Sequence, residues 1–133
     1  MVKNSALTAA TTSGTLPLFT FDVQSSRDRN HYIGTMVGRS IFADMNDGTE
    51  PGIPDGLKVD SIGRVYCTGP GGIWVMAPDG KRVGIIRWPE QAVNFAFGGP
   101  DLRTLLCCAH TSVYTLRVMV PGNPHPWYKL QAR

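Results

Sequence analysis

The feature that most constrains the fold of this chain is a pattern of short apolar runs that recurs after about 40 residues. From Gly56 onward, four such runs are separated by turns rich in Gly, Pro and Asp, at Leu57–Val59, Val65–Thr68, Ile73–Met76 and Val83–Trp88. The Asp79-Gly80 pair between two of these runs is a strong hairpin signal. The segment is therefore predicted to form an antiparallel meander of four strands.

A second set of runs follows at the same spacing, with strands expected at Val93–Phe97, Leu105–Ala109 and Val113–Val118. Aligning the two sets places Cys67 over Cys107 and Trp74 over Tyr114. The period is typical of a four-stranded propeller blade, which cannot bury both of its faces alone and stacks on its neighbours. On this pattern alone, an isolated meander or a small β-sandwich stays open as an alternative.

Composition excludes two classes of partner. The 15 Gly and 10 Pro among 133 residues favour short strands and turns over long helices. The net charge is +3 and the basic residues are scattered, unlike the basic stripe of a nucleic-acid-binding protein. No apolar stretch approaches the roughly 18 residues of a membrane span. Neither nucleic acid nor membrane is an expected partner.

The first third of the chain is expected to be less regular than the rest. Residues 1–15 are rich in Ser, Thr and Ala and lack a signal-peptide pattern, so we expect them to be disordered. Pro17–Val23 and Arg39–Met45 are interpreted as the outer strands of an incomplete blade. Between them, the polar residues 25–38 are predicted to form a solvated loop.

The chain contains three cysteines, Cys67, Cys107 and Cys108, all within apolar β-like runs. An odd number without paired spacing does not indicate a disulfide framework. Buried free cysteines act as small apolar residues, and we expect that role for all three. Free thiols suit a reducing compartment, so a cytoplasmic location is expected.

Three motifs in the second half carry a family resemblance. They are PDG-hydrophobe-x-hydrophobe-D-x-x-G from Pro54, TGPGG-hydrophobe-W from Thr68 and FGG-x-D from Phe97. In this order and at this spacing they resemble the last two blades of gluconolactonases and regucalcin-like lactonases of the senescence marker protein type. The resemblance covers Ile41 to about Gly122, with a fainter likeness at Pro17–Val23.

The resemblance implies an all-β fold that forms part of a six-bladed β-propeller. About two to two and a half blades, each a four-stranded antiparallel meander, would fill a propeller fragment over residues 16–122. The blades are expected near 16–46, 56–88 and 93–120, followed by a C-terminal tail at 123–133.

The resemblance also implies hydrolysis of sugar lactones, such as glucono-1,5-lactone, or of related esters. Family members hold one divalent metal, most often calcium, with zinc and magnesium as alternatives. Of the family's metal ligands, one maps onto this sequence, as Asp55, and the others would lie before Met1. Whether the chain is an enzyme stays open. The alternative is a truncated, catalytically inactive propeller remnant, or a calcium-binding or interaction module.

The chemistry of Asp55 agrees with a metal site. It precedes an inner strand, and in a propeller such loops open onto one end of the channel. Carboxylate oxygens are the ligands that calcium prefers, and a bound metal polarises a carbonyl and lowers the pKa of a bound water. From the residues alone, a role in shaping a Pro-Asp-Gly turn is the favoured explanation of Asp55. The family resemblance reverses this preference in favour of a ligand position.

Two further residues are candidates for binding substrate. Asn94 opens an inner strand near the position that Asp55 occupies one blade earlier, so its amide is a candidate for lining the pocket, although it could merely cap a strand. His110 lies in a loop expected at the same end and is a candidate general base, although a plain surface role fits it too. Turn roles are expected for three other acidic residues, Asp60, Asp79 and Asp101.

No nucleophilic Ser or Cys motif, phosphate-binding loop or zinc spacing is found. A metal-assisted hydrolase is therefore the enzyme class that the residues support. Its expected partner is a small lactone or ester. Unpaired blade edges also predict self-association, including closure of one ring by three copies.

Overall fold

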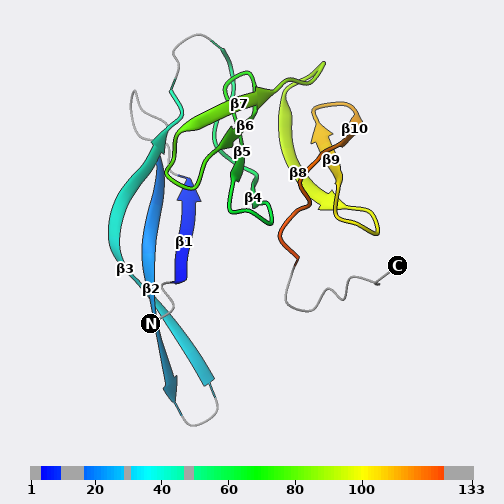
Figure 1. Cartoon of the computed structure of the whole chain (residues 1–133). Coiled ribbons are helices and arrows are strands. Elements are labelled where there is room, and N and C mark those ends of the chain that lie inside the picture. The colour runs from blue at the N-terminus through cyan, green and yellow to red at the C-terminus, as the bar shows by residue number, and fades with distance from the viewer. Residues whose placement is uncertain (1–3, 10–16, 29–30, 47–49, 125–133) are drawn as a thin grey trace. The chain divides into compact units, whose positions relative to one another are not determined.

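The computed structural model describes residues 4–9, 17–28, 31–46 and 50–124 (Figure 1). Regular structure in these residues is entirely β, which confirms the all-β prediction. The strands are β1 (Asn4–Ala9), β2 (Pro17–Asp28), β3 (His31–Asp44), β4 (Leu57–Val59), β5 (Val65–Gly69), β6 (Gly72–Met76), β7 (Arg82–Ile86), β8 (Ala92–Gly98), β9 (Thr104–Ala109) and β10 (Val113–Arg117). The chain divides into two units, residues 1–46 and 47–133.

None of the residues described forms a helix with the length and apolarity that crossing a membrane requires.

The first unit is an antiparallel sheet in the order β1-β2-β3. β2 and β3 pair along their whole length, from Pro17 opposite Asp44 to Asp28 opposite His31. The loop predicted at residues 25–38 is therefore wrong, because all but residues 29–30, which lie outside the described part, are in these two strands. The β-branched and aromatic residues between 31 and 37 favour a strand, and pairing satisfies the backbone of the polar run opposite them.

The expectation of disorder over residues 1–15 is also wrong for the six residues of β1. This strand pairs antiparallel with β2, from Asn4 opposite Val23 to Ala9 opposite Leu18. Composition alone does not reveal this strand, because its hydrogen-bond partners lie more than ten residues along the chain. Residues 1–3 and 10–15 fall outside the described part.

The second unit contains the predicted meander. Its strands pair with their sequence neighbours in the order β4-β5-β6-β7. Gly80, in the turn between β6 and β7, has a φ of 87°, a left-handed conformation that glycine adopts without steric cost. The hairpin prediction from the Asp79-Gly80 pair is confirmed.

A three-stranded sheet, in the order β8-β9-β10, completes the second unit. The repeat predicted from the sequence is visible in its register. Cys67 of β5 lies opposite Trp74 of β6, and Cys107 of β9 lies opposite Tyr114 of β10. Corresponding strands therefore pair at corresponding residues, 40 positions apart.

The two sheets of this unit share one apolar core. Tyr66 of β5 contacts Phe97 of β8 edge to face, with ring centroids 5.2 Å apart. Burying apolar surface between the sheets is the main stabilising contribution. The buried members of this core are Tyr66, Ile73, Val75, Ala92, Phe95, Leu105 and Cys107.

The cysteines are free thiols, but they differ in exposure. Cys67 and Cys107 are buried, as expected, whereas Cys108 is exposed, which corrects the prediction for this residue. Successive side chains of a strand point to opposite faces, so Cys107 and Cys108 cannot both face the core. Burial raises the pKa of the Cys67 thiol to about 12.

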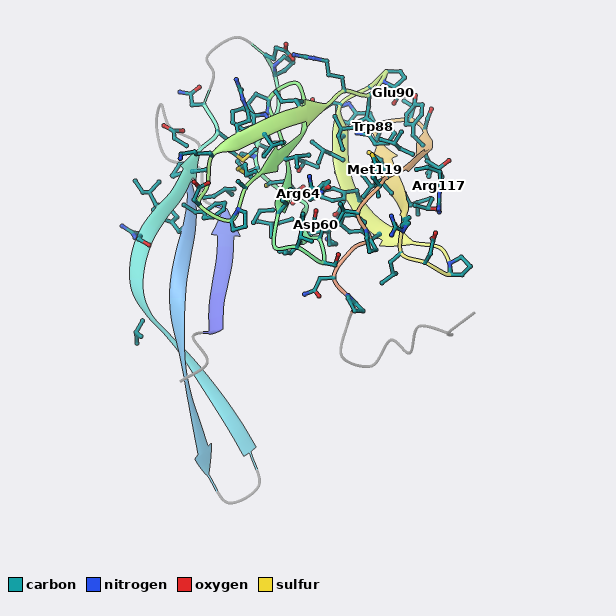
Figure 2. All side chains as sticks on the ribbon, viewed as in Figure 1. Asp60, Arg64, Trp88, Glu90, Arg117 and Met119 are labelled. Carbon is teal, nitrogen blue, oxygen red and sulfur yellow. The ribbon has the colours of Figure 1, made fainter. Side chains whose placement is uncertain are left out.

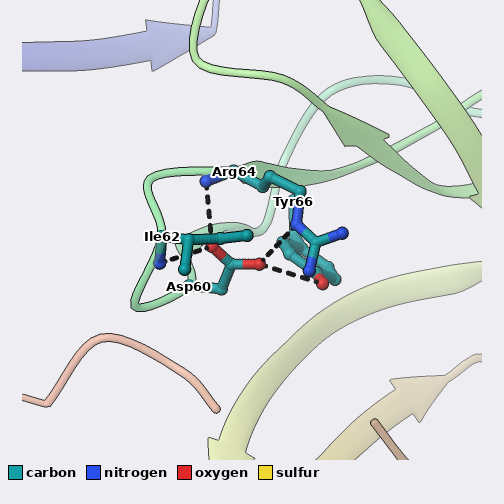
Figure 3. A network of polar contacts seen from close by, with 4 residues as sticks. All are labelled: Asp60, Ile62, Arg64 and Tyr66. Atoms are coloured by element: carbon teal, nitrogen blue, oxygen red, sulfur yellow. Dashed lines mark hydrogen bonds and ion pairs between the residues drawn. The ribbon is translucent and has the colours of Figure 1, made fainter. Parts of the chain in front are cut away.

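Asp60, after β4, forms a buried polar network (Figure 3). One oxygen accepts hydrogen bonds from the backbone N–H groups of Ile62 and Arg64, at 3.1 and 2.9 Å. The other accepts from Arg64 Nε at 2.8 Å and from the Tyr66 hydroxyl at 3.3 Å. The predicted turn role is correct, and the side chain also joins the turn to the core through Tyr66.

The segment after β10 binds beside this network. Ser61 N–H donates to the Pro121 carbonyl and Asn123 N–H donates to the Val59 carbonyl, both at 2.9 Å. Gly122 N–H donates to Leu102, in the turn between β8 and β9. A Cβ atom on Gly122 would overlap the ring of Phe97. The segment therefore ties together the first turns of both sheets.

Replacing Asp60 with Ala is expected to destabilise the protein by about 2–3 kcal/mol, because the partly buried donors of Arg64 and the buried Tyr66 hydroxyl lose their acceptor. Urea unfolding followed by tryptophan fluorescence measures this change. Asp79→Ala is the matched control, because Asp79 is an exposed turn residue, and its midpoint should stay close to that of the wild type. Equal midpoints for both variants would contradict a stabilising role of the network.

Candidate functional site

Strand direction separates the polar residues of the second unit into two groups. Because successive strands are antiparallel, the connections before β4, after β5, before β8 and after β9 lie at one end of the sheets, and the Asp60 turn lies at the other. Glu90 and Asp60 mark these two ends in Figure 2. We call the end that carries Glu90 the site end. It also holds the three predicted site residues, Asp55, Asn94 and His110.

The backbone of Asp55 is held by a buried hydroxyl. Thr68 of β5 is 1% exposed, and its Oγ1 accepts hydrogen bonds from Asp55 N–H at 3.2 Å and Gly56 N–H at 2.9 Å. The Thr68 N–H in turn donates to the Gly56 carbonyl at 2.9 Å. Asp55 itself is exposed, and no ion pair engages its carboxylate in the described residues. The carboxylate is therefore accessible while its backbone is fixed.

Asn94 lies next to this turn. A β-bulge in β8 leaves Val93 as an extra residue, because Ala92 pairs with Ala109 and Asn94 pairs with Cys108. Bulges re-aim side chains and are common beside active sites. A Cβ atom on Gly56 would lie 2.5 Å from Asn94 Oδ1 and 3.0 Å from its Cα, so glycine is required at position 56. The structure thus brings the turn that carries Asp55 into direct contact with Asn94.

His110 is not joined to that pair. It is exposed, in the turn between β9 and β10. Within the described part of the chain, no hydrogen bond or ion pair links its imidazole to Asp55 or Asn94. The general-base role predicted for His110 therefore receives no support from a neighbouring group and stays a prediction.

Glu90 is a residue at the site end that the sequence analysis missed. Its carboxylate accepts hydrogen bonds from Thr111 N–H at 2.8 Å, Thr111 Oγ1 at 2.9 Å and the Tyr114 hydroxyl at 2.8 Å. These donors, the Thr111 N–H first, lower the pKa of Glu90 to about 2. Glu90 thereby fixes the turn that carries His110. No local motif reveals this role, because the donors lie more than 20 residues away.

An ion pair between Arg87 and Glu50 also lies at the site end. Arg87, after β7, donates from Nη1 to both carboxylate oxygens of Glu50, at 2.7 and 2.9 Å. A Cβ atom on Gly71, in the turn between β5 and β6, would overlap the Glu50 carboxylate. Both charged side chains are partly exposed, so the pair contributes little stability. Its effect is to hold the chain before Asp55 against the β5–β6 turn.

The donor atoms at this end fit a hard cation in type but not in number. Asp55 offers an accessible carboxylate, and oxygen ligands are those that calcium takes, usually six to eight of them. In the described residues, however, no group of three or more His, Cys, Asp or Glu side chains could hold a metal. The one accessible carboxylate of Asp55 is thus short of the six to eight oxygen ligands that calcium usually takes.

Glu90→Gln is expected to reduce the loss of folding stability that the protein undergoes on acidification. The folded-state pKa of Glu90, about 2, lies below its ordinary value of 4.5. Its contribution to stability is therefore full above pH 4.5 and is lost as the pH falls toward 2. The variant should be less stable than the wild type near pH 7, and the difference should shrink as the pH falls through this window. Thermal melts across the pH range test this, and a constant difference would contradict it.

Comparisons with known proteins show which family the chain belongs to. The sequence profile of the SMP-30/Gluconolactonase/LRE-like region matches residues 20–111. A gluconolactonase of Zymomonas mobilis is 35% identical over 72 residues, which are 53% of this chain and 20% of that protein. The pentonolactonase XacC of Haloferax volcanii is 36% identical over 75 residues, covering 54% of this chain and 25% of that protein.

A comparison with solved structures agrees with these sequence matches. A solved gluconolactonase structure from Xanthomonas campestris superposes with a TM-score of 0.63 at 23% identity, over 90% of this chain and 34% of that one. The chain thus spans about a fifth to a third of the length of these relatives. Because the family profile matches well over half of its residues, this chain belongs to the SMP-30/gluconolactonase/LRE-like family.

Proposed function

We propose that this chain forms part of the active site of a lactone hydrolase. The observation that carries the proposal is the contact between Gly56 and Asn94, which places the turn that carries the exposed Asp55 against Asn94 at one end of two packed sheets. The curated relatives are a gluconolactonase and a pentonolactonase, so a sugar lactone is the substrate class. The sheets would be neighbouring blades of a six-bladed propeller.

In this proposal Asp55 is a ligand of a divalent metal, with calcium as the first choice because the donor is a carboxylate oxygen. Such a metal, when bound, polarises the lactone carbonyl and lowers the pKa of a water. The Thr68 hydroxyl, by holding the backbone at residues 55 and 56, fixes where the carboxylate can reach. The remaining ligands would come from other parts of the complete propeller.

Asn94 would orient the substrate. Its Oδ1 already accepts a hydrogen bond from Phe95 N–H at 2.8 Å. The amide nitrogen therefore remains to donate to a sugar hydroxyl, since an Asn side chain carries two N–H donors. His110 would line the same rim. The three free thiols support a reducing, cytoplasmic location for this activity.

A catalytically inactive propeller remnant, or a module that binds another chain, is the second candidate. The observation that favours it is the incomplete ligand set, one carboxylate without two further His, Cys, Asp or Glu in the part of the chain that the structure covers. Metal binding and turnover are therefore tested separately.

Calcium is expected to raise the thermal midpoint of the wild type and not that of Asp55→Ala. A ligand that binds the folded state alone stabilises it by about 2.7 kcal/mol at one hundred times its Kd. Differential scanning fluorimetry with and without calcium measures the shift, and Asp79→Ala, which removes an exposed turn carboxylate, should keep the wild-type response. If Asp55→Ala responds as the wild type does, Asp55 is not a ligand.

Asn94→Ala is expected to raise the KM for glucono-1,5-lactone about tenfold and to leave kcat nearly unchanged, because it removes about one hydrogen bond to bound substrate. A pH-indicator assay of acid release, with calcium present, measures both constants. Asn123→Ala is the control, because the backbone N–H of Asn123 that bonds to the Val59 carbonyl is kept in this variant. Absence of hydrolysis by the wild-type chain would favour the non-catalytic candidate.

A further inference from the structure

Asp55 and Gly56 form a pair of residues that can react with each other. In an aspartyl-glycine sequence the amide nitrogen of the glycine can attack the aspartate side chain, because glycine has no Cβ atom to hinder the approach. The chain contains three such pairs, which begin at Asp47, Asp55 and Asp79. Asp47 lies outside the described residues, and the structure describes the other two pairs.

The fold requires this sequence at the site end. A Cβ atom on residue 56 would lie 2.5 Å from Asn94 Oδ1 and 3.0 Å from Asn94 Cα, so this position needs glycine. Asp55 before it is exposed. The packing of the turn against Asn94 therefore places an unhindered amide nitrogen next to an accessible carboxyl group.

The amide of Gly56 is held by the side chain of Thr68. Its N–H donates to Thr68 Oγ1 at 2.9 Å, and both residues are buried. The same oxygen accepts a hydrogen bond from Asp55 N–H at 3.2 Å, and Thr68 N–H donates to the Gly56 carbonyl at 2.9 Å. Gly56 is thus bonded through both its N–H and its C=O. Attack by its nitrogen would have to break the bond to Thr68 and so disturb a buried donor.

The pair Asp79-Gly80 is held without help from another strand pair. Gly80 N–H donates to the Ala77 carbonyl at 2.9 Å, within the turn between β6 and β7. The Asp79 carboxylate is paired with Lys81 Nζ at 3.2 Å and is exposed. Because these contacts are local to the turn, this pair is an internal reference for effects that are specific to Thr68.

We propose that Asp55-Gly56 is a latent site of aspartate isomerisation and that the Thr68 hydroxyl protects it. In this reaction the Gly56 nitrogen forms a bond to Asp55 Cγ and loses its proton. One carboxyl oxygen leaves as water, which takes that proton and one proton from solvent. Water then opens the cyclic imide at either carbonyl. Opening at the main-chain carbonyl of residue 55 gives isoaspartate.

Isomerisation would alter the site end. The main chain would run through the former side chain of residue 55 and become one carbon atom longer, and the free carboxylate would be attached directly to Cα. The turn could then no longer keep both the contact of Gly56 with Asn94 and the bonds to Thr68. The loss of a metal ligand is a further consequence, and this last point alone rests on the proposed function.

Thr68→Val tests the protection, because it keeps the shape of the side chain and removes the oxygen that accepts the Gly56 N–H. Thr68→Ser is the matched control, because it keeps that oxygen. The wild type and both variants are incubated at physiological temperature and neutral pH, without metal or lactone. Enzymatic methyl labelling and peptide mapping then assign isoaspartate to residue 55 or residue 79.

Isoaspartate at residue 55 should accumulate about tenfold faster in Thr68→Val than in the wild type or Thr68→Ser. This factor corresponds to the loss of one hydrogen bond of about 1.4 kcal/mol. Accumulation at residue 79 should be the same in all three proteins. If residue 55 isomerises at the wild-type rate in a folded Thr68→Val, as judged by far-UV circular dichroism, the proposal is wrong.

Two measurements on the wild type decide the question if Thr68→Val does not fold. The Gly56 amide should be protected against hydrogen exchange, and residue 55 should isomerise more slowly in the folded chain than in the same chain in urea. An unprotected Gly56 amide, or equal rates of isomerisation in the two states, would overturn the proposal. None of these measurements uses metal or substrate, so their outcome is independent of the proposed activity.

Discussion

The packing of the four-stranded sheet against the three-stranded sheet is the interaction on which the second unit depends. Each sheet has an apolar face, and neither could bury that face alone. Phe95 and Leu105 from one sheet meet Tyr66 and Ile73 from the other, and each such side chain contributes about 1.5–3 kcal/mol on full burial. The same packing brings the start of β4 beside β8, and so places Gly56 against Asn94.

The two ends of these sheets use the same residue type for opposite purposes. Asp60 is fully buried, accepts four hydrogen bonds and is paired with Arg64. All of its oxygen lone pairs are engaged, so it stabilises and cannot bind a ligand. Asp55, at the site end, is exposed and has its backbone fixed by Thr68. Its carboxylate is therefore available to a cation, which is why the proposed chemistry lies at this end.

The sequence indicated much of this arrangement where short-range signals were strong. The Asp79-Gly80 turn and the repeat that aligns Cys67 with Cys107 were both confirmed by the register of the strands. Prediction failed where a polar segment pairs with a distant partner. Residues 25–38 are hydrophilic enough to suggest a loop, but the hydrogen bonds between β2 and β3 hold them as strands. Glu90 was missed for the same reason, since its donors are distant in sequence.

The sequence by itself determined the antiparallel meanders, their 40-residue repeat and the family, because turn residues and alternation are local properties of the chain. It also marked Asp55 and Asn94 as separate candidates. Only the tertiary structure decided that the turn carrying Asp55 lies against Asn94 and that Asp60 is buried. Each of these depends on which strands lie side by side, and sheet pairing is set by contacts between residues far apart in the chain.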